Sequence, residues 1–339
     1  MPKTALVISG GGSKGAFAVG ALRYIQEAVR PISKFDLYCG TSTGSLIAPL
    51  ALCGELDLLE QQYTTLQQND VVRLGAAARL LTDVSLHDAT PLKNKIYELL
   101  TDERYARISK AAGLCLATVC LQTEQLVYWT TQATLPATGA YATERIASAL
   151  DLRRAMLASA CQPVFMQPIE IRPGAVPVRQ YADGGVREIT PLQAAVDGGA
   201  DTIIAITLGP ARTPADNIPF TSAIQILQRT LDLFGEDVSA SDYQVTRLYQ
   251  QVNLAVGAVR ASLLQQGVAA GTVNQAFAPL AAALAGKPVV TIHEIRPLEK
   301  LVEAGPGGLT FDPASMRAMR DKGYARAKAY FESLPGGVA

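Results

Sequence analysis

The stretch ALVISGGGSKGAFAVGAL, residues 5–22, joins a short apolar run to a longer apolar segment through three consecutive glycines and a Lys-Gly pair. Residues 4–9 are rich in β-forming side chains, and residues 14–29 are apolar with a helical period and contain no proline. The pattern therefore predicts a strand followed by a helix. Glycine-rich turns in this position bind anions, because their backbone N–H groups can approach the ligand closely. That anion is either a nucleotide phosphate or an oxygen that is negative only during a reaction.

The segments that follow complete a βαβ unit. Pro31 ends the first helix, FDLYCG (35–40) predicts a second strand, and TGSLIAPLALCG (43–54) begins a second helix. Two strands joined by one helix in about 40 residues imply parallel strands with a right-handed crossover. The turns at 10–15 and 40–44 consequently share the carboxyl edge of the sheet, where α/β proteins bind their ligands.

The remaining chain continues as mixed helix and strand. Residues 56–110 are expected to be mostly helical with turns at 83–91. Further expected elements are strands in 113–122 and 124–132, a helix over Thr143–Ala158, a strand leading into YADGG (181–185), a helix after Pro191, a strand in 201–209, helices over 219–285, a strand in 288–297 and a helix over Pro313–Glu332. We expect one domain over 1–339. It comprises a core at 4–210, a helical C-terminal insertion or cap at about 215–286, and a closing strand and helix at 288–334.

Composition excludes some classes of protein. Of 339 residues, 49% are hydrophobic and 18% charged, and the 30 basic side chains balance the 30 acidic ones, so nothing indicates a nucleic-acid partner. The five cysteines are odd in number and lack metal-ligand spacing, which predicts reduced core thiols. No run of 18 apolar residues or leader pattern is evident. We expect a cytoplasmic protein, with peripheral membrane contact and homo-oligomerisation left open.

The glycine turn by itself allows a dinucleotide site. Gly10–Gly15 satisfies G-x-G-x-x-G after a strand and before a helix, as such a site requires. The acidic residue that would bind ribose should end the second strand, whereas Asp36 precedes it. A P-loop is excluded because Gly15 follows Lys14, where serine or threonine is needed.

A second motif favours an oxyanion. Gly40, Thr41, Ser42, Thr43 and Gly44 form G-x-S-x-G at a strand-to-helix junction, the context of a nucleophile elbow. An ordinary helix N-cap at Ser42 is the alternative. Because both turns share one sheet edge, the free N–H groups of Gly11 and Gly12 would face an oxyanion that forms on Ser42.

A serine nucleophile needs a base, and three residues are candidates. The sequence has two histidines, His87 in a turn-like segment and His293 on the late strand. His293 fits the Ser…Asp…His chain order of α/β-hydrolases, although a histidine within a strand is more often structural. Asp183, in YADGGV, also follows a strand and would accept the serine proton directly.

The motifs GGGSKG, GTSTGS and DGG, in this order, resemble the signature of patatin-like phospholipases, as does ASACQPVFMQP at 158–168. The resemblance covers about residues 4–210 and implies a three-layer α/β/α fold with a mostly parallel central sheet. It implies a catalytic dyad of Ser42 as nucleophile and Asp183 as general base. The supporting positions are the elbow Gly40, Thr41, Thr43 and Gly44, an oxyanion hole from Gly10, Gly11, Gly12, Ser13, Lys14 and Gly15, and Gly184 and Gly185 beside the base. One departure is REITP (187–191), which lacks the asparagine that many members carry before this proline.

The implied activity is that of a serine hydrolase, a phospholipase A-type lipid acyl hydrolase that cleaves acyl esters of phospholipids or related lipids through an acyl-enzyme. The partner would be a lipid or acyl-ester substrate. We expect no cofactor and no metal, because no cluster of ligand residues is evident. Two alternatives stay open: an esterase of another class with a Ser42–Asp183–His293 triad, and a non-catalytic relative that binds lipid or a partner.

Overall fold

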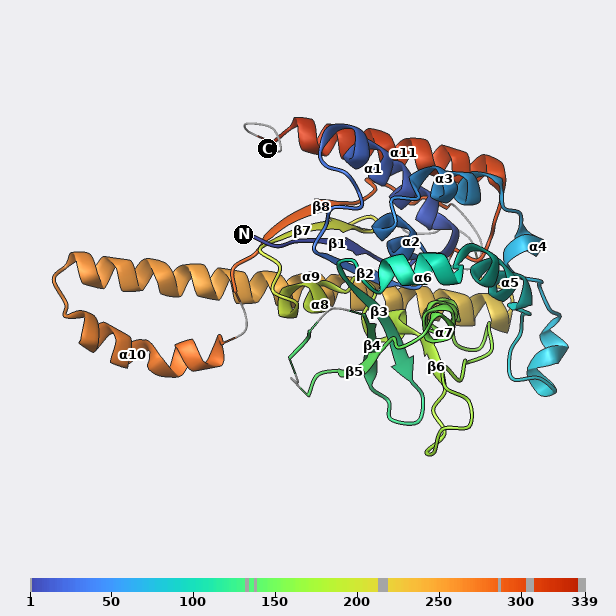
Figure 1. Ribbon diagram of the computed structural model, residues 1–339, viewed down its shortest axis with the longest axis horizontal. Helices are drawn as coiled ribbons and strands as arrows, with labels where there is room; N and C mark the ends of the chain where they lie inside the picture. Colours follow the sequence, from blue (N-terminus) through green and yellow to red (C-terminus); the bar gives the residue numbers. More distant parts are fainter. Residues whose placement is uncertain are drawn as a thin grey trace.

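The computed structural model describes residues 2–131, 134–136, 139–212, 219–285, 288–302 and 308–334. A central sheet lies between two layers of helices, and a long helix passes beneath it and projects beyond it (Figure 1). Alternate side chains of the first strand enter different cores, because successive residues of a strand point to opposite faces. Leu6 and Ile8 pack on one side of the sheet, and Ala5 and Val7 pack on the other.

Within the described ranges, eight strands form one sheet in the order β5-β4-β3-β2-β1-β7-β8, and β6 pairs with β3. Their bounds are β1 Thr4–Ile8, β2 Leu37–Thr41, β3 Gly113–Cys120, β4 Leu126–Thr130, β5 Ala142–Arg145, β6 Tyr181–Asp183, β7 Thr202–Ile206 and β8 Thr291–Ile295. All pairs are parallel except β3 with β4 and β3 with β6. The prediction of an α/β fold with a mostly parallel central sheet is confirmed.

The helices are α1 Gly15–Ala28, α2 Thr43–Leu52, α3 Leu56–Thr65, α4 Gln68–Val71, α5 Thr90–Leu99, α6 Asp102–Ile108, α7 Ala149–Ala160, α8 Leu192–Asp197, α9 Ala223–Gln265, α10 Ala270–Ala283 and α11 Pro313–Glu332. Short 3₁₀ turns lie at Gly12–Lys14, Ala77–Leu81 and Gly184–Val186. Helices including α1, α2, α3, α7 and α11 pack on one face of the sheet, whereas α8 and Tyr243 of α9 pack on the other. All five cysteines are buried and free, as expected.

The prediction of a helix over Thr143–Ala158 is wrong for its first residues. Ala142–Arg145 forms β5, which pairs in parallel with β4 at the edge of the sheet. Helix α7 begins only after Ser148, whose side chain accepts a hydrogen bond from the N–H of Asp151 at 3.0 Å. Pairing with an available strand edge therefore outweighed the local helical pattern, as tertiary contacts often do.

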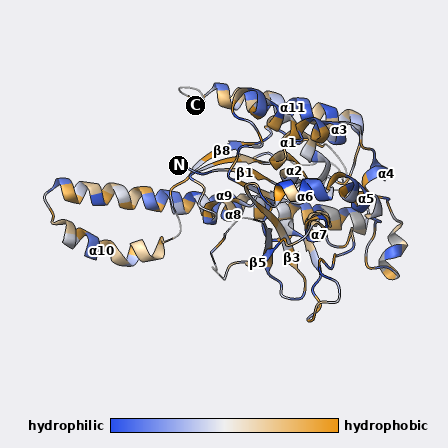
Figure 2. Ribbon diagram, viewed as in Figure 1, coloured by the Kyte–Doolittle hydropathy of each residue, from blue (hydrophilic) through white to orange (hydrophobic). Residues whose placement is uncertain are grey.

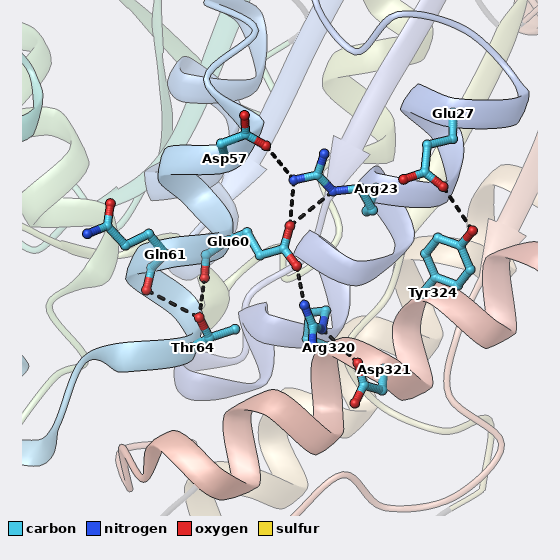
Figure 3. A network of polar contacts seen from close by, with 9 residues as sticks. All are labelled: Arg23, Glu27, Asp57, Glu60, Gln61, Thr64, Arg320, Asp321 and Tyr324. Atoms are coloured by element: carbon cyan, nitrogen blue, oxygen red, sulfur yellow. Dashed lines mark hydrogen bonds and ion pairs between the residues drawn. The ribbon is translucent and has the colours of Figure 1, made fainter.

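The closing helix α11 is fixed to the N-terminal layer by polar side chains (Figure 3). Arg23 of α1 forms ion pairs with Asp57 at 2.6 Å and with Glu60 at 2.5 Å, both on α3. Arg320 of α11 binds the other carboxylate oxygen of Glu60. Tyr324 of α11 also donates a hydrogen bond to Glu27 of α1 at 2.8 Å. The end of the chain thus belongs to the same core as its beginning.

Helix α9 is 43 residues long, and only its first part lies against the sheet. Its second part extends past the amino ends of β1 and β7, and α10 returns beside it (Figure 1), with Arg260 hydrogen-bonded to Asn274 at 2.6 Å. Residues 248–285, which we call the arm, contain one charged side chain, Arg260. Pale to orange colouring in Figure 2 marks the apolar second half of α10.

Among the helices that the structure describes, none combines the length and the apolar character needed to cross a membrane.

Candidate functional site

Ser42 occupies a strained turn between β2 and α2. Its φ of 55° and ψ of −123° lie in a region that non-glycine residues rarely adopt. Glycines on both sides allow the backbone to pass closely: a Cβ atom on Gly40 would lie 2.3 Å from the carbonyl oxygen of Gly44, and one on Gly44 would lie 2.1 Å from that of Ile8. The G-x-S-x-G pattern therefore forms the sharp strand-to-helix turn that the sequence predicted.

Ser159 of α7 holds this turn from the other side. Its hydroxyl oxygen accepts the Ser42 N–H at 2.9 Å, and its hydroxyl donates to the carbonyl oxygen of Ala117 at 2.6 Å. Ser159 was not predicted as a site residue. Its location in the small-residue run ASACQP was the available signal, since such residues allow close packing.

Asp183 reaches Ser42 from a strand of opposite direction. β2 ends at Thr41, which pairs with Ala117, whereas β3 continues to Cys120. β6 pairs in antiparallel fashion with this extension, so Asp183 lies opposite Thr118, one residue beyond Ala117. The aspartate consequently arrives level with the serine turn, close enough for the Ser42 side chain to lower the pKa of its carboxyl group.

Asp183 binds a proton more readily in its buried surroundings than an aspartate does in water. Burial raises the pKa of its carboxyl group from 3.8 to about 6, and the nearby Ser42 side chain and the Gly185 N–H partly offset this rise. The Gly185 N–H donates at 2.8 Å. Gly184 packs against Ala117, because a Cβ atom on it would lie 2.5 Å from that carbonyl oxygen.

The glycine turn at 10–15 lies beside Ser42. A Cβ atom on Gly10 would be 3.1 Å from the Cβ of Ser42. Four of its six N–H groups have backbone acceptors: Gly10 donates to Ile189 at 3.0 Å, Ser13 to Gly308 at 2.8 Å, Lys14 to Gly11 at 3.2 Å, and Gly15 to Gly12. Within the part of the chain that the structure describes, the N–H groups of Gly11 and Gly12 have no such acceptor.

A cavity of about 930 Å³ opens over Ser42, Asp183 and Gly10–Gly12. Apolar side chains of α2, α3, α5 and α7 form much of its wall, among them Leu46, Leu50, Leu59, Leu92, Ile96 and Met156. Residues of the first part of α9, including Phe234, also line it. The cavity is large enough for a drug-sized or lipid-like ligand.

Lys14 lines this cavity rather than standing free at a helix start. The lysine is partly buried and faces Asp232 and Glu236 of α9. Burial lowers the pKa of Lys14, and the two carboxylates act in the opposite direction. Burial likewise raises the pKa of Asp232, and the positive charge of Lys14 partly offsets that rise. Charged groups thus gather where α9 faces Lys14, whereas the walls from α2, α3, α5 and α7 are mainly apolar.

Neither histidine of the sequence lines the cavity. Nδ1 of His87 accepts the Gly75 N–H at 3.1 Å, and the ring packs against Phe165. His293, on β8, lies 3.3 Å from the hydroxyl of Tyr330 on α11 and packs against Phe331. Both side chains have structural surroundings, and the structure does not bring His293 to Ser42.

Two other kinds of ligand site were considered, a dinucleotide site and a metal site. Asp36 accepts the Thr4 N–H at 2.8 Å, at the start of β1 and away from the glycine turn. It is therefore unavailable to a ribose bound at residues 10–15. The described residues contain no group of three or more His, Cys, Asp or Glu side chains that could hold a metal ion.

Fold and site together define an α/β protein with a strained serine, a buried aspartate and a glycine turn at one end of a large cavity. The chain belongs to the patatin-like phospholipase family, whose family model matches residues 6–196. This membership supports a hydrolase that acts on lipid esters. The match covers the glycine turn, the serine turn and Asp183, and it ends before α9.

Individual relatives are more distant. A cUMP-AMP-activated phospholipase from Escherichia coli is 39% identical over 79 residues, which are 22% of this chain and 25% of that protein. Uncharacterized NTE family proteins from Mycobacterium bovis and Mycobacterium tuberculosis are 26% identical over 247 residues, 71% of this chain and 59% of theirs. The chain thus spans from a quarter to about three fifths of the length of these relatives. VipD from Legionella pneumophila aligns with a TM-score of 0.42 at 11% identity, over 98% of this chain and 67% of that one.

Proposed function

We propose that the protein is a serine lipid acyl hydrolase that uses Ser42 and Asp183 as a dyad. The observation that carries this proposal is that the strained Ser42 and the buried Asp183 lie next to each other in the wall of one large, mainly apolar cavity. Ser42 Oγ attacks the carbonyl carbon of an acyl ester while Asp183 accepts its proton. Asp183 then returns the proton to the leaving alcohol, and water hydrolyses the acyl-enzyme by the same steps.

Asp183 is suited to this role by its burial. A general base is most effective when its pKa approaches the working pH, and an unperturbed aspartate with a pKa of about 3.9 is a weak base at neutrality. With a pKa of about 6, Asp183 remains ionised at pH 7 but binds a proton more readily than a free aspartate. No histidine is required in this scheme, in agreement with the location of His87 and His293.

The oxyanion of the tetrahedral intermediate would be stabilised by the N–H groups of Gly11 and Gly12. The sequence suggested the whole turn from Gly10 to Gly15 as the oxyanion hole. Backbone acceptors already occupy the N–H groups of Gly10, Ser13, Lys14 and Gly15, so we assign the role to the two that remain. Removal of one such donor from an enzyme typically costs about 3 kcal/mol of transition-state stabilisation.

The substrate class follows from the cavity. The walls formed by α2, α3, α5 and α7 would bury an acyl chain, because apolar surface gains about 25 cal/mol per Å² when it leaves water. The charged groups on the α9 side would lie near the polar part of the lipid. Phospholipids and related acyl esters fit this division, and a protein that hydrolyses them must meet a lipid surface.

A fluorophosphonate probe followed by intact-mass measurement tests the proposal directly. Wild type and the exposed control Ser262→Ala should gain one adduct, Ser42→Ala should gain none, and Asp183→Asn should react much more slowly. An unreacted wild type, or an adduct that persists on Ser42→Ala, would contradict the assignment. A non-catalytic lipid-binding relative would bind vesicles without forming an adduct or releasing fatty acid.

A further inference from the structure

The long helix α9 makes a direct polar contact with the turn that follows Asp183. Oδ2 of Asp242 accepts the N–H of Ile189 at 3.1 Å and the N–H of Thr190 at 2.8 Å. Thr190 is fully buried, so its N–H group depends on this acceptor. Asp242 lies outside the span of the family match and carries no recognised motif.

The same turn holds the glycine loop. The carbonyl oxygen of Ile189 accepts the N–H of Gly10 at 3.0 Å, and Gly10 lies against Ser42. A continuous chain of hydrogen bonds thus runs from Asp242 through residues 189 and 190 to the first glycine of the loop. Gly11 and Gly12, the proposed oxyanion donors, follow Gly10 directly.

Further hydrogen bonds hold the residues on either side of Ile189 and Asp242. The buried carboxylate of Glu188 accepts hydrogen bonds from the hydroxyl of Tyr128 and, at 3.2 Å, from the N–H of Gln193. Tyr243, the next residue of α9, shares a hydrogen bond of 2.7 Å with Thr207, which directly follows β7. Burial raises the pKa of both Glu188 and Asp242, and the charge of Asp242 raises that of Glu188 further.

We infer that Asp242 is a positioning residue of the active site: it fixes the turn at residues 189 and 190, and through Gly10 it sets the direction of the Gly11 and Gly12 N–H groups. Asp242 itself does not line the cavity and acts through Ile189, which does. This assignment rests on the proposed function for its catalytic consequence, because the direction of the donors matters only for an oxyanion on Ser42. The structural consequence is independent of that function.

The test compares two substitutions at one position. Asp242→Ala removes the acceptor, whereas Asp242→Asn keeps a carbonyl oxygen where Oδ2 stood. Gln244→Ala, exposed on the same helix, is the matched control. With a soluble acyl ester as substrate, we expect Asp242→Ala to lower kcat by about 10- to 100-fold with little change in KM, as misplaced donors do. Asp242→Asn should restore kcat to within a few-fold of wild type, and the control should not differ from it.

Hydrogen–deuterium exchange of the same proteins separates this inference from the proposed function. Peptides that cover residues 5–15 and 186–193 should exchange faster in Asp242→Ala than in wild type, and Asp242→Asn should restore their protection. This outcome would support the positioning role even if Ser42 proved unreactive towards the fluorophosphonate. Unchanged exchange in Asp242→Ala, or a kcat within twofold of wild type, would overturn it. Equal acceleration in all peptides would also overturn it, because Asp242 would then stabilise the fold in general.

Discussion

The carboxyl edge of the sheet around Ser42 and the arm at residues 248–285 differ in how firmly the rest of the chain holds them. At the edge, most polar groups have partners from distant parts of the chain: Ser42 contacts Ser159, Gly10 contacts Ile189, and Ser13 contacts Gly308. In α10, by contrast, Val273 is buried, whereas most of the other side chains that the structure describes in this helix face solvent.

This difference determines where a substitution should matter. A segment held by long-range hydrogen bonds and close backbone contacts opens only when much of the fold opens with it. A segment with few buried contacts can fluctuate alone. The site belongs to the first kind and the arm to the second. Changes of equal chemical size should therefore have unequal effects on activity and on the free energy of unfolding.

The largest effect is expected for Ser42→Ala. Loss of a serine nucleophile lowers kcat by several orders of magnitude, and we expect at least a 10⁴-fold decrease in ester hydrolysis. The melting temperature should change little, because the Ser42 N–H that binds Ser159 is kept. Steady-state kinetics beside thermal unfolding checks both statements. An active Ser42→Ala variant would contradict the dyad proposal, whereas an inactive but unfolded one would show that the Ser42 hydroxyl stabilises the fold.

Two glycine substitutions should affect the stability of these two regions in opposite directions. A Cβ atom on Gly44 would meet the carbonyl oxygen of Ile8 at 2.1 Å, whereas one on Gly257 of α9 would meet nothing within 4 Å. Gly44→Ala should lower the free energy of unfolding by roughly 3 kcal/mol or more, because backbone must move. Gly257→Ala should raise it by about 0.5–1 kcal/mol, since alanine favours helix over glycine.

Denaturant titrations of both glycine variants measure these changes. Comparable destabilisation of the two would mean that the arm is packed as tightly as the serine turn, contrary to its exposure. A stable and active Gly44→Ala variant would show that the turn can relax around the added methyl group.

The pH dependence tests the environment of Asp183. Its folded pKa of about 6 lies above the unfolded value near 3.8, so the folded state binds the proton more tightly between these values. The dyad needs the ionised form, and kcat/KM should fall about tenfold per pH unit below pH 6. For stability the sign is reversed: the contribution of Asp183 is greatest below pH 4 and is lost as pH rises to 6.

Asp183→Asn checks both signs at once. This variant should lack the acid limb of the activity profile and the corresponding decrease in stability between pH 4 and 6. An acid limb near pH 4 in wild type would show that Asp183 is solvated and titrates as a free aspartate.

Much of this site could be predicted because its determinants are local. The strand-to-helix turns at Gly10–Gly15 and Gly40–Gly44 are encoded by glycines beside apolar runs, and parallel strands place both at one edge. Asp183 was proposed as the base from DGG, although its position on an antiparallel strand was not predicted. The closing helix Pro313–Glu332 was predicted to the residue, since Pro313 and the cap at Asp312 are local signals.

The residues that hold the site could not be predicted, because their partners are distant in sequence. Ser159 lies 117 residues from Ser42, and Asp242 lies 52 residues from Thr190. Nothing in the neighbouring sequence distinguishes Asp242 from the other acids of α9. Strand β5 was missed for the same reason, as its pairing with β4 depends on an edge that local patterns do not reveal.

The smallest effect is expected on the arm itself. Leu254 of α9 is 59% exposed, whereas Leu22 of α1 is fully buried. Leu254→Ala should change the free energy of unfolding by less than about 0.5 kcal/mol, as exposed positions do, whereas Leu22→Ala should cost about 2–5 kcal/mol for the cavity it leaves. Denaturant unfolding at two protein concentrations measures both. A large, concentration-dependent loss in Leu254→Ala would mean that a second molecule covers the arm in solution, since a contact within one chain has no such dependence.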